Sequence, residues 1–460
     1  MFAKIRYFHF IGIGGIGMSG LAKILLEWGY ELSGSDLQPN EQTIALEKMG
    51  AKIFYSHQAE NIGEKTDVII YSSAINHSNP EYKAAIERKI PRVKRSLLLG
   101  LMCQNWKKTL AVSGTHGKTT TSAMLVHIFK SAGKNPGFFL GGVIQPENTN
   151  ASTGDDNILV IEADEYDHSF LDIRPHFAIV NNIELDHTDI YYDCESLYKS
   201  FVEFLQTIPF YGAAILNLDD AGCRKIIPRL SVPILTFGQD QQAMYHLKQF
   251  ELNSEGAKAL LCLPDGVETS LQLQVPGMHN LMNATAAFAL AHHLGLPENS
   301  ISSALSGFTS VNRRFQKVAD INGIIFIDDY AHHPTELSAT LNAARAHYPH
   351  RRIIAVFQPH TYTRTRDFFT DFARAITKAD LVFILDIYPA REKAIENVSA
   401  KLIADAARYY AKIPVYEVHS KETLPQLLYE KLQSGDLAIF IGAGDVSQLC
   451  KNTLDYYGKI

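Results

Sequence analysis

The sequence predicts an α/β protein built from three consecutive domains. Short apolar runs typical of buried strands alternate with helical periodicity from one end of the chain to the other. Two of the strand–helix junctions carry glycine-rich turns, and the alternation restarts twice after polar segments. A chain of 460 residues is also too long for one core, since domains usually hold about 100 to 200 residues.

The first predicted domain covers residues 1–105 and is Rossmann-like. Its strands are expected at residues 6–11, 30–33 and 66–72, with helices at 18–28 and near 41–49. Strands that alternate with helices in this way build a parallel sheet. The polar segment at residues 103–108 marks its end.

The second and third predicted domains cover residues 106–312 and 313–460. The central one is expected to be P-loop ATPase-like, with a mainly parallel sheet and an antiparallel addition between residues 250 and 275, where apolar and polar residues alternate around two turns. The C-terminal one is again Rossmann-like α/β. The expected strands are residues 109–113, 157–161, 177–181 and 213–216 in the central domain, and 324–327, 353–357, 381–385 and 437–441 in the last.

Composition narrows the function classes. The net charge of −6 arises from 43 basic and 49 acidic residues without a basic stripe, so no nucleic-acid partner is expected. The five cysteines are scattered, which favours reduced thiols in the cytoplasm. The N-terminal apolar run is interrupted by glycines, and nowhere do about 18 apolar residues follow one another, so neither a cleaved leader nor a membrane span is expected.

The first chemical motif is Gly12-Ile13-Gly14-Gly15-Ile16-Gly17, which has the spacing G-x-G-x-x-G between a predicted strand and a predicted helix. Glycines let the backbone approach a pyrophosphate, whose charge the helix N-terminus stabilises. Asp36 follows 19 residues after Gly17, where an acid can meet a ribose hydroxyl. The motif favours a nucleotide, although a glycine turn that only packs helix on strand has the same pattern.

The second motif runs from Ser113 to Thr121 and reads S-G-T-H-G-K-T-T-T. Backbone amides of such a loop cradle phosphates, the lysine neutralises β and γ charges, and the following threonine can ligate magnesium. Val112 stands where the full Walker motif needs its first glycine, so this is a shorter G-x-x-G-K-T variant. We expect ATP to be bound by Gly114, Thr115, His116, Gly117, Lys118, Thr119 and Thr120.

Two phosphate loops in separate domains are explained together by an enzyme that holds a nucleotide-linked substrate and ATP. Further polar groups follow the predicted strands: the acids of residues 162–165, Asp186-His187, Asn280 with Asn283, and the segments 328–334 and 358–366. Carboxylates near a phosphate loop suit Mg²⁺, and asparagines three apart can face an adenine edge. Taken alone, the acid and histidine groups are more often a solvated acid cluster or a surface histidine, and the asparagines can equally be a helix cap.

Six motifs, at residues 10–20, 113–121, 162–165, 279–284, 328–333 and 358–366, resemble those of the Mur ligases in the same order along nearly the whole chain. The resemblance implies an ATP-dependent, amide-bond-forming ligase of peptidoglycan synthesis, with ATP and Mg²⁺ as cofactors. The implied substrates are UDP-N-acetylmuramate and L-alanine, joined through an acyl phosphate.

The resemblance also implies roles for individual residues. The UDP sugar is expected at Gly14, Gly15, Gly17, Asp36 and Ser73. The nucleotide is further expected at His279, Asn280, Asn283, Arg314 and Asp329, and the metal at Thr119, Glu162 and His187. Alanine is expected at Tyr330, His332 and Arg364, and the catalytic residues are expected to be Lys118, His332 and Arg364.

The sequence departs from the family pattern at two positions. Thr361 stands where some relatives have arginine, and Lys199 does not fall at the spacing of the carbamoylated lysine of several sister ligases. Three alternatives stay open at this point: a ligase that attaches a preformed peptide to the same UDP sugar, an NAD-dependent dehydrogenase, and a nucleotide sensor without catalysis. The oligomeric state is not predicted.

Overall fold

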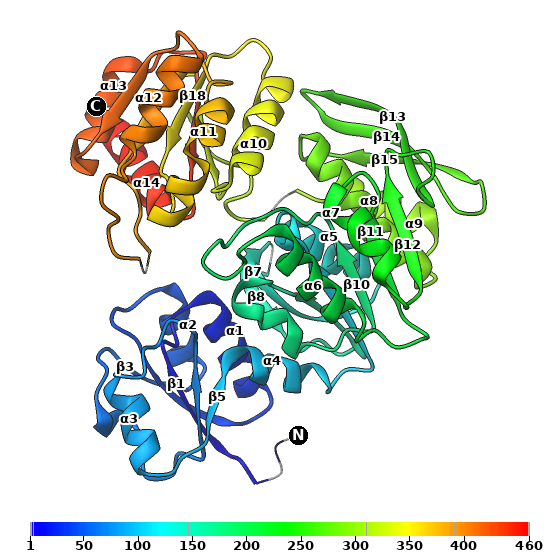
Figure 1. Ribbon diagram of the computed structural model, residues 1–460, viewed down its shortest axis with the longest axis vertical. Helices are drawn as coiled ribbons and strands as arrows, with labels where there is room; N and C mark the ends of the chain where they lie inside the picture. The colour runs from blue at the N-terminus through cyan, green and yellow to red at the C-terminus, as the bar shows by residue number, and fades with distance from the viewer. Residues whose placement is uncertain (1, 3, 146, 310, 391, 459–460) are drawn as a thin grey trace. The chain divides into compact units, whose positions relative to one another are not determined.

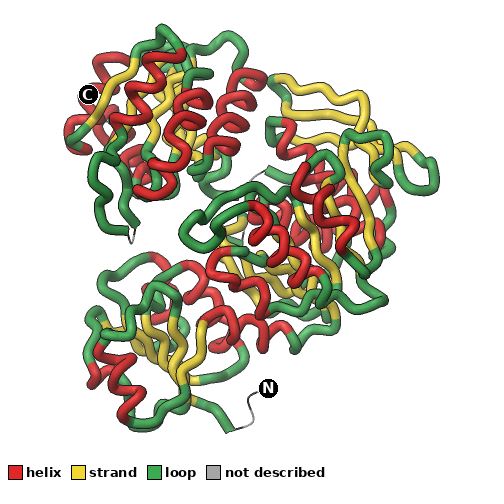
Figure 2. The backbone as a smooth tube through the Cα atoms, viewed as in Figure 1, coloured by secondary structure: helices red, strands yellow, loops and turns green. Residues whose placement is uncertain are grey.

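The computed structural model describes residues 2, 4–145, 147–309, 311–390 and 392–458. Helices and strands alternate throughout these residues, as Figures 1 and 2 show, and the described strands form sheets of five, ten and six strands. This confirms the predicted α/β class with three successive sheets. Among the described helices, none combines the length and apolar composition that crossing a membrane requires.

The chain forms two compact units. Unit 1 comprises residues Met1–Glu184, Cys194–His246 and Ala286–Ala304, and unit 2 comprises Leu185–Asp193, Leu247–Thr285 and Leu305–Ile460. The domain ranges 1–105, 106–312 and 313–460 stay a prediction.

The first sheet lies in unit 1 and has the order β3-β2-β1-β4-β5, and each strand pairs in parallel with its neighbours. Its strands are β1 (Tyr7–Ile11), β2 (Glu31–Ser35), β3 (Lys52–Phe54), β4 (Val68–Tyr71) and β5 (Arg92–Lys94). Its helices are α1 (Ile16–Glu27), α2 (Glu41–Lys48), α3 (Pro80–Glu87) and α4 (Arg95–Cys103), with the 3-10 helix η1 (Ala59–Asn61). The strand order reverses between β1 and β4, and the carboxyl edge at such a reversal is where open α/β sheets bind ligands.

The second sheet has the order β15-β14-β13-β12-β11-β10-β6-β9-β7-β8. Its strands are β6 (Lys108–Ser113), β7 (Gly137–Ile144), β8 (Thr149–Ser152), β9 (Ile158–Glu162), β10 (Phe177–Val180), β11 (Ala213–Asn217), β12 (Ile234–Gly238), β13 (Tyr245–Asn253), β14 (Gly256–Cys262) and β15 (Glu268–Leu273). Strands β6, β9, β10, β11 and β12 pair in parallel, whereas β14 pairs antiparallel with β15 and β7 with β8. The predicted antiparallel addition is therefore present, and β7 with β8 adds a second antiparallel pair that the sequence reading missed.

The helices of this middle region are α5 (Lys118–Ser131), α6 (Cys194–Leu205), α7 (Ala221–Ile226), α8 (Met278–His293) and α9 (Glu298–Ser306), with the 3-10 helices η2 (Tyr166–Asp172) and η3 (Ile227–Arg229). Helix α5 is almost entirely buried because it follows β6 directly and packs on the parallel strands. Its first residue, Lys118, therefore starts at the carboxyl edge of the sheet.

The third sheet lies in unit 2 and has the order β16-β17-β21-β18-β19-β20. Its strands are β16 (Gln316–Ile321), β17 (Ile324–Asp329), β18 (Ile353–Phe357), β19 (Leu381–Leu385), β20 (Val415–Val418) and β21 (Leu437–Ile441). Its helices are α10 (Pro334–His347), α11 (Tyr362–Ile376), α12 (Lys401–Tyr410), α13 (Leu424–Lys431) and α14 (Val446–Tyr457), with the 3-10 helix η4 (Lys421–Thr423).

Alternate residues of the third sheet pack on opposite layers of helices. One core joins inward residues such as Ile327, Ala355 and Ile439 with helices α10, α11 and α12. The other joins their sequence neighbours with α13 and α14 (Figure 1). Strands buried on both faces explain why the sequence shows continuous apolar runs here instead of alternation.

Candidate active site

The glycine turn of the first sheet is held by Asp36. Gly12 has φ +79°, and Oδ2 of Asp36 accepts a hydrogen bond from the Gly14 N–H at 2.8 Å. A Cβ placed on Gly14 would lie 2.8 Å from that oxygen, so the close approach requires glycine. The expected contact of Asp36 with a ribose hydroxyl stays a prediction, because the structure shows this carboxylate bound to the turn itself.

The other residues expected around the UDP sugar also lie at the carboxyl edge of the first sheet. Ser73 is exposed in the turn after β4. Arg95, which the sequence reading missed, begins α4 directly after β5, and its Nη1 would lie 3.0 Å from a Cβ placed on Gly17. A basic group beside a glycine turn suits a pyrophosphate. The signal was its place after a strand, but β5 itself was not predicted.

The phosphate loop leads from β6 into α5. Gly114 and Gly117 have φ +121° and +81°, the left-handed region that favours glycine. The loop backbone is fixed by the residue pair that follows β10: the Thr115 N–H donates to the Asn182 carbonyl at 3.1 Å, and the His116 N–H donates to Oδ1 of Asn182 at 2.8 Å. These hydrogen bonds fix the loop against the residues that follow β10.

Lys118 is surrounded by acceptors. Its Nζ donates to the Gly114 carbonyl at 2.6 Å and to Oε2 of the buried Glu165 at 2.8 Å, and Oδ1 of Asp164 lies 3.7 Å away. Desolvation is the largest single influence and lowers the pKa of Lys118, but Glu165 and Asp164 together outweigh it and raise the pKa above its ordinary value. The lysine is a fixed positive charge.

The acid at the end of β9 meets the threonine that follows Lys118. Oγ1 of Thr119 donates to Oε2 of Glu162 at 3.1 Å, and the other carboxylate oxygen accepts from the Gly141 N–H at 2.8 Å. The structure thus brings together two of the three predicted metal ligands, and both offer the oxygen atoms that Mg²⁺ prefers. The third, His187, lies in unit 2 with φ +54°, and its N–H donates to Oδ1 of Asp186 at 2.8 Å.

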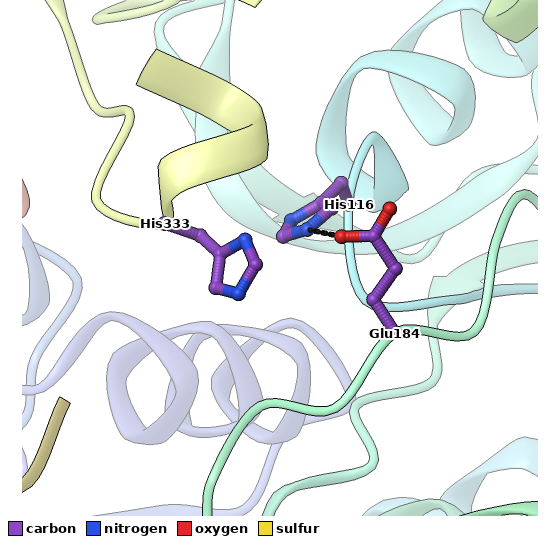
Figure 3. A group of neighbouring side chains, drawn as sticks. All are labelled: His116, Glu184 and His333. Carbon is purple, nitrogen blue, oxygen red and sulfur yellow. Dashed lines mark hydrogen bonds and ion pairs between the residues drawn. The ribbon is translucent and has the colours of Figure 1, made fainter. Parts of the chain in front are cut away.

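His116 pairs with an acid that the sequence reading did not single out. Nε2 of His116 lies 3.3 Å from Oε2 of Glu184, and Figure 3 shows the two side chains facing each other. The main chain of Glu184 is tied to the phosphate loop as well, since Oγ1 of Thr115 donates to its carbonyl at 3.0 Å. Glu184 therefore orients the histidine of the loop.

The nucleotide residues expected in unit 2 lie at the start of α8 and the end of β17. Nδ2 of Asn280 donates to the Pro276 carbonyl at 2.7 Å, and Nδ2 of Asn283 lies 3.5 Å from Oδ1 of Asn280. Some of the hydrogen bonds of these two side chains are therefore made at the start of α8. His279 is exposed beside them. Their contact with adenine stays a prediction.

Asp329 and Arg314 form a second part of this group. The carboxylate of Asp329 accepts from the Phe315 N–H at 2.7 Å and the Ala331 N–H at 2.8 Å, and burial raises its pKa to about 6. The Arg314 guanidinium stacks on the Tyr330 ring at 5.3 Å and lies 3.7 Å from Glu336.

The three residues expected to bind the amino acid are close to one another in unit 2. The Tyr330 and His332 rings lie 5.3 Å apart, and His332 lies 5.8 Å from His360, which in turn contacts Arg364. Nδ1 of His332 is 3.0 Å from the Tyr330 carbonyl, which can only accept, so Nδ1 carries the proton and Nε2 is the acceptor nitrogen. Burial lowers the pKa of His332 to about 4, so the ring is neutral at neutral pH.

Two acids organise this group, and the sequence reading gave neither of them a role. Glu336 accepts the His332 N–H at 2.9 Å and completes the capping box of α10 with His333, the histidine also drawn in Figure 3. Asp186 forms a buried ion pair with Arg364. In the sequence, Asp186 stands out only as the neighbour of His187. Because 178 residues separate Asp186 from Arg364, no local pattern signals their contact.

Three family models match the chain in order: "Mur ligase family, catalytic domain" over residues 7–107, "Mur ligase middle domain" over 112–291 and "Mur ligase, glutamate ligase domain" over 313–444. The chain is 41% identical over 455 residues to the UDP-N-acetylmuramate--L-alanine ligase of Geobacter sp. (strain M21), covering 99% of this chain and 98% of that protein.

Solved structures agree with these matches. UDP-N-acetylmuramate-alanine ligase MurC from Thermotoga maritima has a TM-score of 0.85 and 29% identity, covering 98% of this chain and 99% of that one. The UDP-N-acetylmuramate:L-alanyl-gamma-D-glutamyl-meso-diaminopimelate ligase from Neisseria meningitides has a TM-score of 0.62 and 30% identity, covering 67% of this chain and 100% of that one. With the three models in register and 41% identity over nearly its whole length, the chain belongs to the Mur ligase family.

Proposed function

We propose that this protein is an ATP-dependent ligase that joins L-alanine to UDP-N-acetylmuramate in peptidoglycan precursor synthesis. The observation that carries the proposal is the phosphate loop, with Lys118 beside Glu165 and Thr119 beside Glu162, in a chain 41% identical to a protein of that name. In the proposed reaction the muramate carboxylate takes the γ-phosphoryl group of ATP and ADP leaves. The amine of alanine then attacks the acyl phosphate, and inorganic phosphate leaves as the amide forms.

Unit 1 supplies the groups for phosphoryl transfer. Lys118 is a fixed cation that stabilises negative charge on the transferring phosphoryl group. The Gly114 carbonyl and the Glu165 carboxylate already balance the positive charge of the lysine. The oxygens of Thr119 and Glu162 fit Mg²⁺ and would hold it. When bound, the ion would neutralise the negative charge of the phosphate oxygens. Gly14, Gly15, Gly17, Asp36 and Ser73 would bind the UDP sugar.

Unit 2 supplies the groups for the amino acid. Nε2 of His332 faces the incoming amine as a proton acceptor, because Nδ1 is committed to the Tyr330 carbonyl. Arg364 holds the alanine carboxylate, and Tyr330 lies beside His332 to limit the space for the methyl group. His279, Asn280, Asn283, Arg314 and Asp329 would contact the nucleoside of ATP.

The alternatives outside the family explain less of the molecule. An NAD-dependent dehydrogenase uses the glycine turn after β1 and leaves the groups around Lys118 without a role. A nucleotide sensor needs the phosphate loop but not the histidine and arginine groups that follow β17 and β18.

The proposal is tested by measuring ADP release with purified protein, ATP and Mg²⁺. Release should require both UDP-N-acetylmuramate and L-alanine, and mass spectrometry should find UDP-N-acetylmuramoyl-L-alanine in equal amount. Removing Mg²⁺ with a chelator should stop turnover, and returning it should restore turnover. ADP release that ignores the UDP sugar would refute the proposed function.

A further inference from the structure

Asp186 binds one side of the Arg364 guanidinium. Nε of Arg364 donates to Oδ1 of Asp186 at 3.1 Å, and Nη2 donates to Oδ1 and Oδ2 at 2.8 and 2.9 Å. Both side chains are only 7% exposed. The side of the guanidinium formed by Nε and Nη2, which usually binds a carboxylate with two parallel hydrogen bonds, is therefore taken by an internal carboxylate.

Nη1 of Arg364 lies 3.0 Å from Nδ1 of His360. One of its two N–H groups faces this ring. Nη2 also carries a second hydrogen, which points away from Asp186 because both oxygens of that carboxylate lie on the Nε side of Nη2. In the described part of the chain no contact takes this hydrogen or the second Nη1 hydrogen, so these two are the donors that the guanidinium offers to a substrate.

A substrate carboxylate is not expected to displace Asp186. Displacement would leave a buried carboxylate without its counter-ion, which is far more costly than the gain from a second hydrogen bond to the substrate. The pair therefore persists when the amino acid binds, and Asp186 fixes the direction in which the remaining N–H groups of Arg364 point.

We propose that Asp186 is a positioning residue for the amino-acid site: it clamps Arg364 so that the guanidinium binds the substrate carboxylate through the Nη1 and Nη2 hydrogens that face away from Asp186. The inference rests on the proposed function, since it assigns the carboxylate of alanine to Arg364. Asp186 itself does not touch the substrate.

The same chain segment offers a matched control. Two residues beyond Asp186, Oγ1 of Thr188 donates to Oδ2 of Asp367 at 2.7 Å, so a second side-chain contact ties residues Leu185–Asp193 to α11. This contact is more exposed and does not involve Arg364. Thr188→Val removes it and leaves the clamp in place.

The experiment compares L-alanine with L-alaninamide, which keeps the amine and methyl group but replaces the carboxylate by a neutral amide. For each enzyme, the ratio of kcat/KM for alanine to kcat/KM for alaninamide is measured. This ratio does not depend on how much of the preparation is folded, so a purely structural role of Asp186 leaves it unchanged.

Asp186→Asn should lower the ratio about tenfold or more, because the guanidinium is no longer held within the narrow range that productive geometry needs. The KM values for ATP and UDP-N-acetylmuramate should stay within about twofold. Thr188→Val should keep the wild-type ratio. If Asp186→Asn does not fold, Asp186→Glu, which keeps the charge on a longer side chain, should show a smaller fall in the ratio.

A wild-type ratio in the folded Asp186 variants would overturn the inference, and a lower KM for alanine in Asp186→Asn would show that Asp186 competes with the substrate instead. Both results leave the proposed function intact. Wild-type enzyme that releases no ADP with alanine would instead refute the proposed function itself.

Discussion

The side chains of the phosphate loop are arranged to hold one positive charge in a fixed place. Lys118 begins α5 after a left-handed glycine, and its ammonium contacts two loop carbonyls and the buried Glu165. A lysine fixed in this way is preorganised, so little rearrangement is needed when phosphate charge develops beside it.

Lys118→Ala should reduce ADP release about 100- to 1000-fold, which corresponds to about 3 to 4 kcal/mol of barrier. The matched control is Lys130→Ala on the same helix, because Lys130 pairs with Glu147 near the surface. Steady-state turnover and a thermal unfolding curve of each variant provide the measurement. Near-normal turnover in folded Lys118→Ala would contradict the assignment of the loop.

Arg364→Lys should raise the KM for alanine about ten- to hundredfold, since losing a charged hydrogen bond costs about 1.5 to 3 kcal/mol. Lysine keeps a cation for Asp186 but lacks the planar donors of arginine. Arg366→Ala, whose side chain is 51% exposed and pairs with Asp367, is the control and should keep the wild-type KM. An unchanged KM in Arg364→Lys would place the alanine carboxylate elsewhere.

Helix α3, beside the first sheet, carries a buried carboxylate that gives a pH-dependent contribution to stability. Glu81 is fully buried and accepts from Oγ of Ser35 at 2.6 Å and Nδ2 of Asn61 at 2.7 Å, with His57 3.0 Å away. Desolvation is the largest influence and raises its pKa, but the nearby His9 ring and the hydrogen bonds from Ser35 and Asn61 outweigh it, so the pKa lies below the ordinary 4.5.

A carboxyl whose pKa is lowered by folding stabilises the protein above its unfolded pKa and loses that contribution as the pH falls. Glu81→Gln should therefore lower the free energy of unfolding by about 1 to 3 kcal/mol near pH 6. The difference from wild type should shrink as the pH falls below 4.5. Urea unfolding at several pH values measures it. Glu87→Gln at the exposed end of α3 should show no such trend, and a difference for Glu81→Gln that stays constant with pH would be evidence against this account.

The site residues are placed in the same way in each sheet: the functional groups follow the carboxyl ends of parallel strands. The sequence predicted this arrangement because central strands such as β6, β9 and β18 contain apolar runs followed by polar residues. Three of the strands that were not predicted lack such a pattern. β3 and β5 have three residues each, too few for a periodic pattern, and β16 is an edge strand with exposed polar residues.

Helix α4 packs on the 3-10 helix η2 through a glycine. A Cβ placed on Gly100 would lie 2.0 Å from the Asp172 carbonyl oxygen, so the helix approaches that backbone as closely as glycine allows. Gly100→Ala should therefore destabilise the protein by about 1 to 3 kcal/mol, although alanine is the better helix former.

Gly63→Ala is the control for this prediction, because its Cβ would meet only Oγ1 of Thr66 at 3.8 Å. The midpoint of urea unfolding should shift for Gly100→Ala and stay within error for Gly63→Ala. A Gly100→Ala variant as stable as wild type would contradict this prediction, because it would mean that α4 and η2 can move apart without loss of stability.

Over the whole molecule, the fold class and the order of motifs follow from local patterns, whereas the pairing of side chains does not. Some residues expected to act together are neighbours within one unit, such as Thr119 with Glu162 and Tyr330 with His332, whereas the expected metal ligand His187 lies in unit 2. Asp186, Glu184 and Arg95 gain their roles from contacts made by folding. Polar groups such as Asp36 and Asn280 bind the protein's own backbone, which residue spacing cannot reveal.

The central claim is that alanine, rather than a preformed peptide, is joined to the UDP sugar. The direct measurement is a competition in which the enzyme, ATP, Mg²⁺ and UDP-N-acetylmuramate receive equal concentrations of L-alanine and L-alanyl-γ-D-glutamyl-meso-diaminopimelate. Mass spectrometry of the products at early time points should find UDP-N-acetylmuramoyl-L-alanine in large excess. A product in which the tripeptide exceeds alanine would contradict the account and assign the protein to the peptide-attaching branch of the family.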